Sequence, residues 1–288
     1  MNYRHAFHAG NHCDVLKHTA LALVLEALGK KAKPFVVLDA FAGRGRYDLT
    51  SPEAMRSSEA AGGIGAIFHE TDAPISLSPY LDAVRRENPS GMLRWYPGSP
   101  ALAAEAIRAG DRLVACDLHP EEARKLEHCL ETFPNARAEH RDGYQAIRAF
   151  LPFPERRSLV LIDPPFERPG EFDRLASALL DIRRRFATCV VVSWYPIKGS
   201  DARTHFEMKV AEIGFENVMS ASLEIAGASP LRLTGSALLV VNPPYGLSDA
   251  LSTALSWIAH RLKASEGAGW RVAEWEGRHP VFERSEVV

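Results

Sequence analysis

The chain has 288 residues, 46% of them hydrophobic, which is enough for one large domain or for a domain that carries an inserted subdomain. Its formal charge of −2 at pH 7 excludes a globally basic protein, so any contact with a polyanion needs a local patch. Four cysteines without paired spacing argue against a zinc ribbon or a disulfide framework. We find no signal peptide and no membrane-spanning run, so we expect a cytoplasmic protein that contacts no membrane.

The first predicted element is an amphipathic helix over residues 14–29, with Asp14 near its start and Gly29 at its end. Short β-branched and leucine-rich runs then predict strands at 35–39, 112–117, 136–141, 158–163, 188–194, 217–225 and 236–242. Helical patterns lie between several of these runs, at 119–132, 143–151, 171–186 and 201–213. This alternation predicts an α/β fold with an open, mostly parallel, Rossmann-like sheet of seven strands.

Three segments depart from the alternation. The last two strand runs are joined without a helix, so we expect a hairpin whose final strand is antiparallel. Residues 50–110 begin with a Ser/Pro/Glu-rich stretch and predict a small inserted helical subdomain within a main domain made of 1–49 and 111–265. Residues 266–288 show no clear period and are expected to form a loosely attached C-terminal tail.

A glycine-rich turn, Asp39-Ala-Phe41-Ala-Gly43-Arg-Gly45, directly follows the first predicted strand. Glycines at this point let the backbone turn tightly and approach a ligand that a Cβ atom would exclude. The third glycine of the dinucleotide fingerprint is missing, and the turn alone also fits an ordinary connection between a strand and a helix.

The next two predicted strands also end in polar residues, Asp117 and the pair Asp142-Gly143. An acid at the end of the second strand of a nucleoside-binding doubly wound fold accepts hydrogen bonds from ribose hydroxyls, and Asp142 is placed to receive an adenine amino group. The 78 residues from Asp39 to Asp117 exceed the usual spacing, and the inserted segment accounts for the difference. Ligands bind at the carboxyl edge of such sheets, so three successive polar strand ends predict a nucleoside site, although each alone also fits a solvated loop.

The motif Asp163-Pro164-Pro165-Phe166 follows the fourth predicted strand. A carboxylate and a proline carbonyl that accept both hydrogens of an adenine amine draw its nitrogen toward tetrahedral geometry, and the lone pair can then attack a sulfonium methyl group in line. The aromatic ring offers a face for base stacking, worth ~1–3 kcal/mol. The pattern is that of amino-methyltransferases acting on exocyclic nitrogens, with Asp163 as the catalytic candidate, and a plain proline turn is the alternative.

A second match to this pattern is Asn242-Pro243-Pro244-Tyr245. It follows the strand that we expect to be antiparallel, so it would lie at the opposite edge of the sheet from the ligand site. We therefore interpret it as a structural turn.

The N-terminal stretch 1–46 is locally basic, with seven Lys and Arg against three Asp and Glu, a net charge of +4. The spacing of its four histidines fits no standard zinc pattern, so we predict no metal site. Its functional interpretation is a lid over residues 1–18 that faces RNA and cofactor through Tyr3, Arg4 and Lys17. A plain polar arm is the alternative.

The stretches YRHAFHAGNHCDVLKH, LDAFAGRGRY, YPGSP and LIDPPFE, in this order, closely resemble the bacterial 23S ribosomal RNA adenine-N6 methyltransferase J family. The resemblance covers roughly residues 2–265, and the N-terminal motif is its most distinctive part. It implies a class I S-adenosylmethionine-dependent methyltransferase that modifies the N6 amine of one adenine in 23S rRNA. The implied partner is 23S rRNA, protein-free or in an early assembly intermediate.

Carried over position by position, the resemblance implies a cofactor site made of His18, Phe41, Ser99, Asp117, Asp142, Gly143 and Asp163, with Asp163 also catalytic. Tyr3 matches a position implicated in contact with substrate RNA. Together with the lid and the proline motif this gives an RNA-contact set of Tyr3, Arg4, Lys17, Pro164 and Phe166. The family often has histidine at the position of Phe41 and tyrosine at that of Phe166, and residues beyond about Trp275 have no counterpart.

Two other functions remain open from the sequence. A methyltransferase for another exocyclic amine, such as guanine N2 in rRNA or adenine N6 in DNA, would carry much the same motif, and only the N-terminal motif separates it from the first interpretation. A noncatalytic RNA-binding protein with this fold would predict decay of Asp163 or of the glycine turn, and both are intact.

Overall fold

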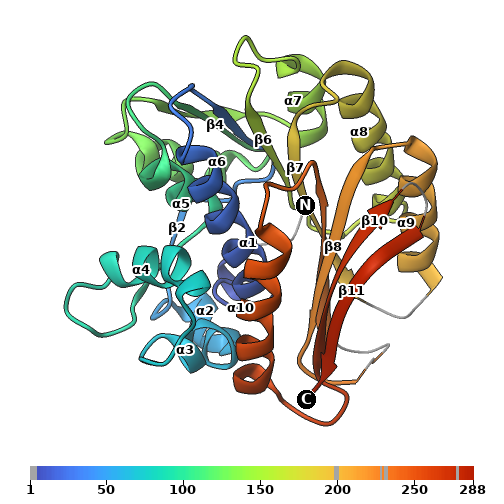
Figure 1. The fold of residues 1–288 in the computed structure, drawn as a ribbon. Helices are drawn as coiled ribbons and strands as arrows, with labels where there is room; N and C mark the ends of the chain where they lie inside the picture. Colours follow the sequence, from blue (N-terminus) through green and yellow to red (C-terminus); the bar gives the residue numbers. More distant parts are fainter. Residues whose placement is uncertain (1–4, 198–200, 228, 230–232, 277–278) are drawn as a thin grey trace.

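The computed structural model describes residues 5–197, 201–227, 229, 233–276 and 279–288. Within these residues nine strands pair into one sheet, in the order β11-β10-β8-β9-β7-β6-β1-β4-β5 (Figure 1). Five neighbouring strands are parallel and correspond to predicted runs: β7 (Val190–Ile197), β6 (Ser158–Ile162), β1 (Val36–Asp39), β4 (Arg112–Asp117) and β5 (Ala136–His140). The predicted Rossmann-like α/β architecture is therefore confirmed.

The other half of the sheet is antiparallel. Strand β9 (Gly235–Val241) runs antiparallel to β7 and forms the expected hairpin with β8 (Asn217–Glu224), which confirms both predictions. Strands β10 (Gly269–Glu276) and β11 (His279–Val287) then extend the sheet beyond β8.

The two additional strands overturn the prediction of a seven-stranded sheet and of a loose tail over 266–288. Strand β10 is buried on both of its faces, since Val272 packs into the core on one side and Ala273 and Trp275 pack into the core on the other. A strand buried on both faces has no alternation of polar and apolar residues, and alternation was the signal we sought.

Two layers of helices enclose the sheet, each with its own apolar core (Figure 1). One face is covered by α1 (His12–Gly29), α5 (Ser99–Ala106), α6 (Pro120–Leu130) and α10 (Leu247–Leu262). The other face is covered by α7 (Gly143–Phe150), α8 (Glu171–Arg185) and α9 (Asp201–Ile213). The predicted helices at 119–132, 143–151, 171–186 and 201–213 are thus confirmed.

Helix α1 differs from its prediction in one important respect. It starts two residues earlier, because the Asn11 side chain accepts hydrogen bonds from the backbone N–H groups of Cys13 (2.9 Å) and Asp14 (3.1 Å). It is not amphipathic but buried almost all round, since it lies between the sheet and α4, α5 and α10. Its polar residues Lys17 and His18 are therefore interior groups.

Residues 46–97 form small elements beside this fold. Strands β2 (Arg46–Asp48) and β3 (Trp95–Pro97) make a separate two-stranded sheet. Short helical segments accompany them and the N-terminus: η1 (His5–Phe7), α2 (Pro52–Ser57), η2 (Glu59–Gly62), α3 (Ile64–Ile67), η3 (Ile75–Leu77) and α4 (Ser78–Arg86). Helix α5, also inside the expected 50–110 insertion, packs on α1, β1 and β4, and the domain boundaries remain a prediction. Among the described helices, none is long and apolar enough to cross a membrane.

Candidate active site

A cavity of about 740 Å³ lies at the carboxyl edge of the parallel strands, a volume within the range of small-molecule sites. Eight of the residues predicted for the site line it: Lys17, His18, Phe41, Ser99, Asp117, Asp163, Pro164 and Phe166. Tyr3 and Arg4 lie outside the described residues. The start of α1, which is far from β6 in the sequence, thus meets the proline motif in space.

A buried ion chain connects α1 with the proline motif. The Lys17 ammonium donates to Oδ1 of Asp14 at 2.8 Å and to Oδ2 of Asp163. The other oxygen of Asp14 accepts from the backbone N–H of Gly10 at 2.9 Å and contacts His5 Nε2 at 3.0 Å. Asp163 is thereby held in one orientation by a cation that is itself fixed on the helix.

The neighbouring charges of this buried ion chain stabilise the charged forms of Lys17 and Asp14. Burial alone would lower the pKa of Lys17, but the carboxylates of Asp14 and Asp163 outweigh it and hold that pKa above its usual range. Burial would likewise raise the pKa of Asp14, yet Lys17 and His5 hold it well below its usual range. Lys17 is therefore charged, but two carboxylates already engage it, and its predicted contact with RNA stays a prediction.

Asp14 was missed by the sequence interpretation, which used it only as a helix-start signal. Its spacing of three residues from Lys17 places the two side chains on the same face of a helix, and this was the available signal.

His18 lies on α1 one turn beyond Asp14. It is neutral, because burial lowers its pKa to about 3. Its Nδ1 is 2.8 Å from the hydroxyl of Tyr96, which in turn lies 3.1 Å from the hydroxyl of Tyr80. The imidazole also stacks on the Tyr96 ring, with centroids 5.6 Å apart. These contacts orient the His18 ring at the cavity wall.

The glycine turn after β1 is shaped for close approach. Gly43 and Gly45 adopt φ of 64° and 84°, and a Cβ atom would lie 2.3 Å from the Tyr47 hydroxyl or 2.7 Å from the Cys129 sulfur, respectively. Asp117, at the end of β4, accepts from the backbone N–H of Gly43 at 3.0 Å. The carboxylate thus fixes the glycine turn as well as lining the cavity.

Two further acids near this turn were also missed. Glu122 on α6 lines the cavity and accepts two hydrogen bonds from Arg44, at 2.7 and 2.6 Å. Asp39 ends β1 with its side chain 1% exposed. Arg44 lies between the two glycines of the turn, and its ion pair with Glu122 accounts for a cation at this position. No local sequence pattern pointed to Glu122 as its partner.

The proline motif leaves β6 with its aromatic ring in the cavity wall. Phe166 adopts a φ of 51°, unusual for a residue with a side chain. Its ring packs edge-on against Phe172 and Trp194, with centroid distances of 4.9 and 5.8 Å. Trp194, on β7, lines the same cavity and adds a second aromatic surface that the sequence did not reveal.

Asp142 and Gly143 take a different place from the one expected of them, beside the cavity wall and not in its lining. The Asp142 carboxylate caps α7 by accepting from the backbone N–H of Gln145 at 3.0 Å. At Gly143 a Cβ atom would lie 2.1 Å from the Ala40 carbonyl oxygen and 2.8 Å from the Phe41 ring. The glycine therefore lets α7 pack against the turn after β1, and a cofactor contact for this pair stays a prediction.

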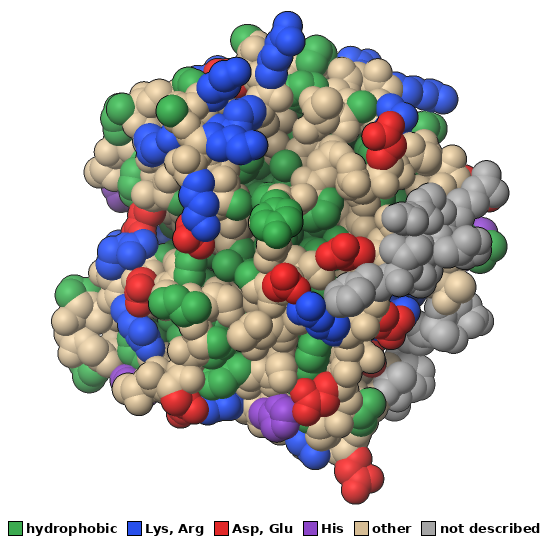
Figure 2. Space-filling model, in the orientation of Figure 1, with side chains coloured by type: hydrophobic (Ala, Val, Ile, Leu, Met, Phe, Trp, Pro, Cys, Tyr) green, Lys and Arg blue, Asp and Glu red, His purple; other side chains and the backbone are tan. Residues whose placement is uncertain are grey.

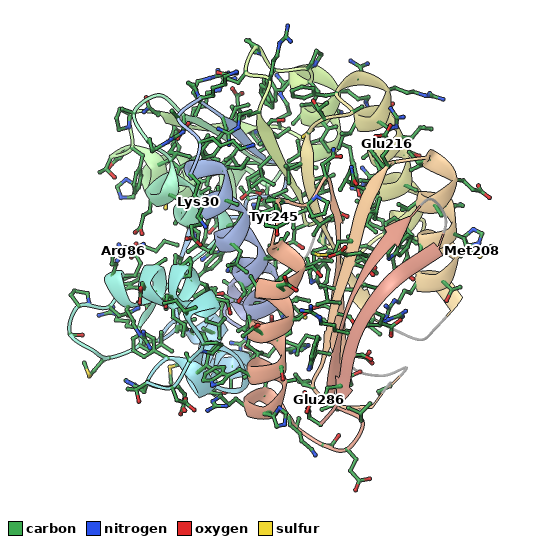
Figure 3. The ribbon with its side chains drawn as sticks, in the orientation of Figure 1. Lys30, Arg86, Met208, Glu216, Tyr245 and Glu286 are labelled. Carbon is green, nitrogen blue, oxygen red and sulfur yellow. The ribbon has the colours of Figure 1, made fainter. Side chains whose placement is uncertain are left out.

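The second proline motif lies at the other edge of the sheet. Asn242 follows the antiparallel strand β9, and its side-chain amide donates to the carbonyls of Ala187 (2.8 Å) and Cys189 (2.7 Å), just before β7 begins. Tyr245 points outward and is fully exposed (Figure 3). The interpretation of this motif as a structural turn agrees with this position. No group of acids, histidines and cysteines in the described residues has a geometry that could hold a metal.

An α/β sheet with a glycine turn after β1, an acid at the end of β4 and an Asp-Pro-Pro-Phe turn after β6, all at one cavity, defines the class I methyltransferase architecture. The family model described as "Ribosomal RNA large subunit methyltransferase D, RlmJ" matches residues 32–276, and the chain belongs to this family.

Individual relatives agree with this assignment over nearly the whole chain. The chain is 37% identical to "Ribosomal RNA large subunit methyltransferase J" of Escherichia coli K12 and 36% identical to the protein of the same name from Haemophilus influenzae. Each match covers 96% of this chain and 98% of the relative. A crystal structure of a Legionella pneumophila protein superposes with a TM-score of 0.85 at 31% identity, covering 94% of this chain and 98% of the other.

Proposed function

We propose that the protein transfers the methyl group of S-adenosylmethionine to the N6 amine of one adenine in 23S rRNA, in the cytoplasm. The observation that carries this proposal is the position of Asp163-Pro164-Pro165-Phe166, which ends a parallel strand in the same cavity as the glycine turn. Family membership and relatives named for the large-subunit RNA support the choice of substrate.

The cavity fits S-adenosylmethionine, which supplies an electrophilic methyl group on a sulfonium sulfur. Gly43 brings the backbone of the turn after β1 into the cavity lining, and Asp117 presents a carboxylate at the strand end where ribose hydroxyls bind in folds of this class. Phe41 offers an apolar ring on the same wall, packed edge-on against Tyr144 at a centroid distance of 5.0 Å. These groups would hold the cofactor, with Ser99 and His18 on the adjoining wall.

The target amine would be held by the proline motif. The Asp163 carboxylate and the Pro164 carbonyl accept its two hydrogens, so the nitrogen lone pair is no longer delocalised into the ring and can form the new N–C bond. The bond between the methyl group and the sulfonium sulfur would break as the N–C bond forms, leaving a neutral thioether, and the amine would lose one proton to the Asp163 carboxylate that holds it. Lys17 acts here as a positioning residue, because its contact with Asp163 keeps the carboxylate oriented.

An adenine inside a helix cannot reach this position, so it must be unpaired or flipped out, at a cost of a few kcal/mol. Phe166 provides a ring against which the extruded base can stack, and Trp194 provides another aromatic surface nearby. Stacking contributes about 1–3 kcal/mol per base, enough to offset much of this cost.

The proposal is tested by incubating the protein with labelled S-adenosylmethionine and protein-free 23S rRNA, followed by nucleoside analysis of the digest. We expect N6-methyladenosine at a single position. Matched reactions use an assembled large subunit, 16S rRNA and duplex DNA. N2-methylguanosine as the product, or a preference for DNA, would contradict the proposal, and a preference for assembled subunits would contradict only the early-assembly part of it.

A further inference from the structure

A basic surface lies at the amino-terminal edge of the sheet, opposite to the cavity. It is formed by the segments 26–35, 108–112 and 155–157, which lead into the neighbouring parallel strands β1, β4 and β6. Figure 2 shows Lys and Arg side chains gathered on this part of the molecule, at the upper left, and Lys30 marks its position in Figure 3. We call these three segments the basic platform.

The charge of the basic platform contrasts with that of the remaining chain. Its segments contain seven Lys and Arg and three Asp and Glu, a net charge of +4, so all other residues together carry −6. The three acids are each engaged by a platform cation: Glu26 by Lys30, Asp111 by Arg108 and Glu155 by Arg112. In the described part of the chain no ion pair involves Lys31, Lys33 or Arg156, and all three are exposed.

Two arginines, Arg108 and Arg157, hold the backbone of the loop that carries these lysines. Arg108 donates to the carbonyls of Gly29 (3.0 Å) and Lys31 (2.9 Å), and Arg157 donates to those of Leu28 (2.7 Å) and Lys33. The two guanidinium groups also lie over the ring of buried Phe35, at 5.7 and 5.9 Å from its centroid.

The two arginines affect the charge as well as the position of this loop. The carbonyls at the C-terminus of α1 carry partial negative charge, and two arginines neutralise them while leaving the lysine side chains free. Because the backbone that carries Lys31 and Lys33 is already held, less conformational entropy is lost when their unpaired ammonium groups bind phosphates.

We propose that the basic platform is a second RNA-contact surface, which binds the phosphate backbone of the substrate RNA at a distance from the target adenine. The inference rests on the proposed function for the identity of the RNA. Along α1, at about 1.5 Å per residue, Lys31 lies about 20 Å from Lys17 in the cavity. This distance exceeds the length of a few stacked nucleotides, so only a longer RNA reaches both places.

The test compares Lys31→Ala/Lys33→Ala with a matched control, Arg184→Ala/Lys263→Ala, which removes two exposed cations outside the three platform segments. Binding of a long 23S rRNA fragment and of a five-nucleotide adenine-containing RNA is measured over a range of salt concentrations. We expect the platform variant to bind the long RNA roughly tenfold more weakly and its salt slope to fall by about 2, because each lost phosphate contact lowers the slope by about 1. The control should match the wild type.

Turnover distinguishes the platform from the catalytic site. In the platform variant we expect a higher KM for the long RNA, with kcat at saturating RNA, cofactor affinity and short-RNA binding unchanged. A wild-type salt slope in the platform variant, or an equal loss in the control, would overturn the proposal. If the wild type makes no N6-methyladenosine, the proposed function fails, and the binding comparison still decides whether the platform holds RNA.

Discussion

Replacing Asp39 by asparagine probes the least compensated charge near the cavity. The side chain is 1% exposed, and the hydrogen-bonding groups that face it, the Ser99 hydroxyl and the backbone N–H of Phe41, offset only part of the cost of burying its charge. Burial raises the pKa of Asp39 from the ordinary 3.8 to about 7. The substitution keeps the size of the side chain and removes the ionisation.

The expected effect has a definite sign and pH window. A folded-state pKa about three pH units above that of the unfolded chain corresponds to about 4 kcal/mol, at ~1.36 kcal/mol per unit. Because the folded protein binds this proton more tightly, the stabilising contribution is complete below about pH 4 and is lost as the pH rises to 7. Asp39→Asn should therefore match the wild type near pH 4 and exceed its stability by up to about 4 kcal/mol above pH 7.

The assay is urea unfolding of wild type and variants between pH 2.5 and pH 9, and the matched control is Asp111→Asn. Asp111 is also buried, and burial alone would raise its pKa, but the hydrogen bonds from the Arg108 side chain and from the backbone N–H groups of Arg108 and Phe35 together outweigh burial and lower it. The control should therefore show the opposite sign, with a loss of stability at neutral pH that fades as the pH falls below 4. A difference for Asp39→Asn that does not change with pH, or a variant less stable than the wild type at pH 8, would refute the reasoning.

Three further substitutions test the site. Asp163→Ala should abolish methyl transfer, whereas Asn242→Ala should retain most of it, because Asn242 lies at the opposite edge of the sheet; a folded but inactive Asn242 variant would argue against this. Asp117→Ala should weaken S-adenosylmethionine binding at least tenfold by calorimetry, since a charged hydrogen bond contributes about 1.5–3 kcal/mol; unchanged affinity would remove Asp117 from the site. Gly143→Ala should lower stability by about 1–3 kcal/mol in thermal unfolding, because its Cβ would lie 2.1 Å from the Ala40 carbonyl oxygen, and an unaffected melting temperature would contradict that packing.

The sequence was sufficient for features that depend on local pattern. Strand runs alternating with helical runs predicted the five parallel strands, and the missing helix before 236–242 predicted the antiparallel β9. The direction of β9 then separated Asp163 from Asn242, two residues in nearly the same motif, because chain direction decides at which edge of the sheet a strand ends.

Features that depend on tertiary pairing were not accessible in this way. Strand β10 carried no alternation because both of its faces are buried, and β8, which joins it and the adjacent β11 to the sheet, is more than 40 residues away in the sequence. The partners of Arg44 and of Asp163 are equally remote: Glu122 is 78 residues from Arg44, and Lys17 is 146 residues from Asp163. Such pairs are fixed by the fold and leave no local spacing to detect.

The net charge of the N-terminal stretch 1–46 is a further case in which the sequence alone did not reveal where side chains lie in the fold. Its net charge of +4 suggested one basic lid, but α1 carries its lysines to opposite ends of the molecule. Lys17 is enclosed at the carboxyl edge by Asp14 and Asp163, whereas Lys31 and Lys33 are exposed at the amino edge. A charge summed along a sequence window describes a surface only if the window stays on one side of the protein, and a helix about 27 Å long does not. The free charge available to RNA is therefore to be sought just after the end of α1, whereas the buried charge near its start is paired with Asp14 and Asp163.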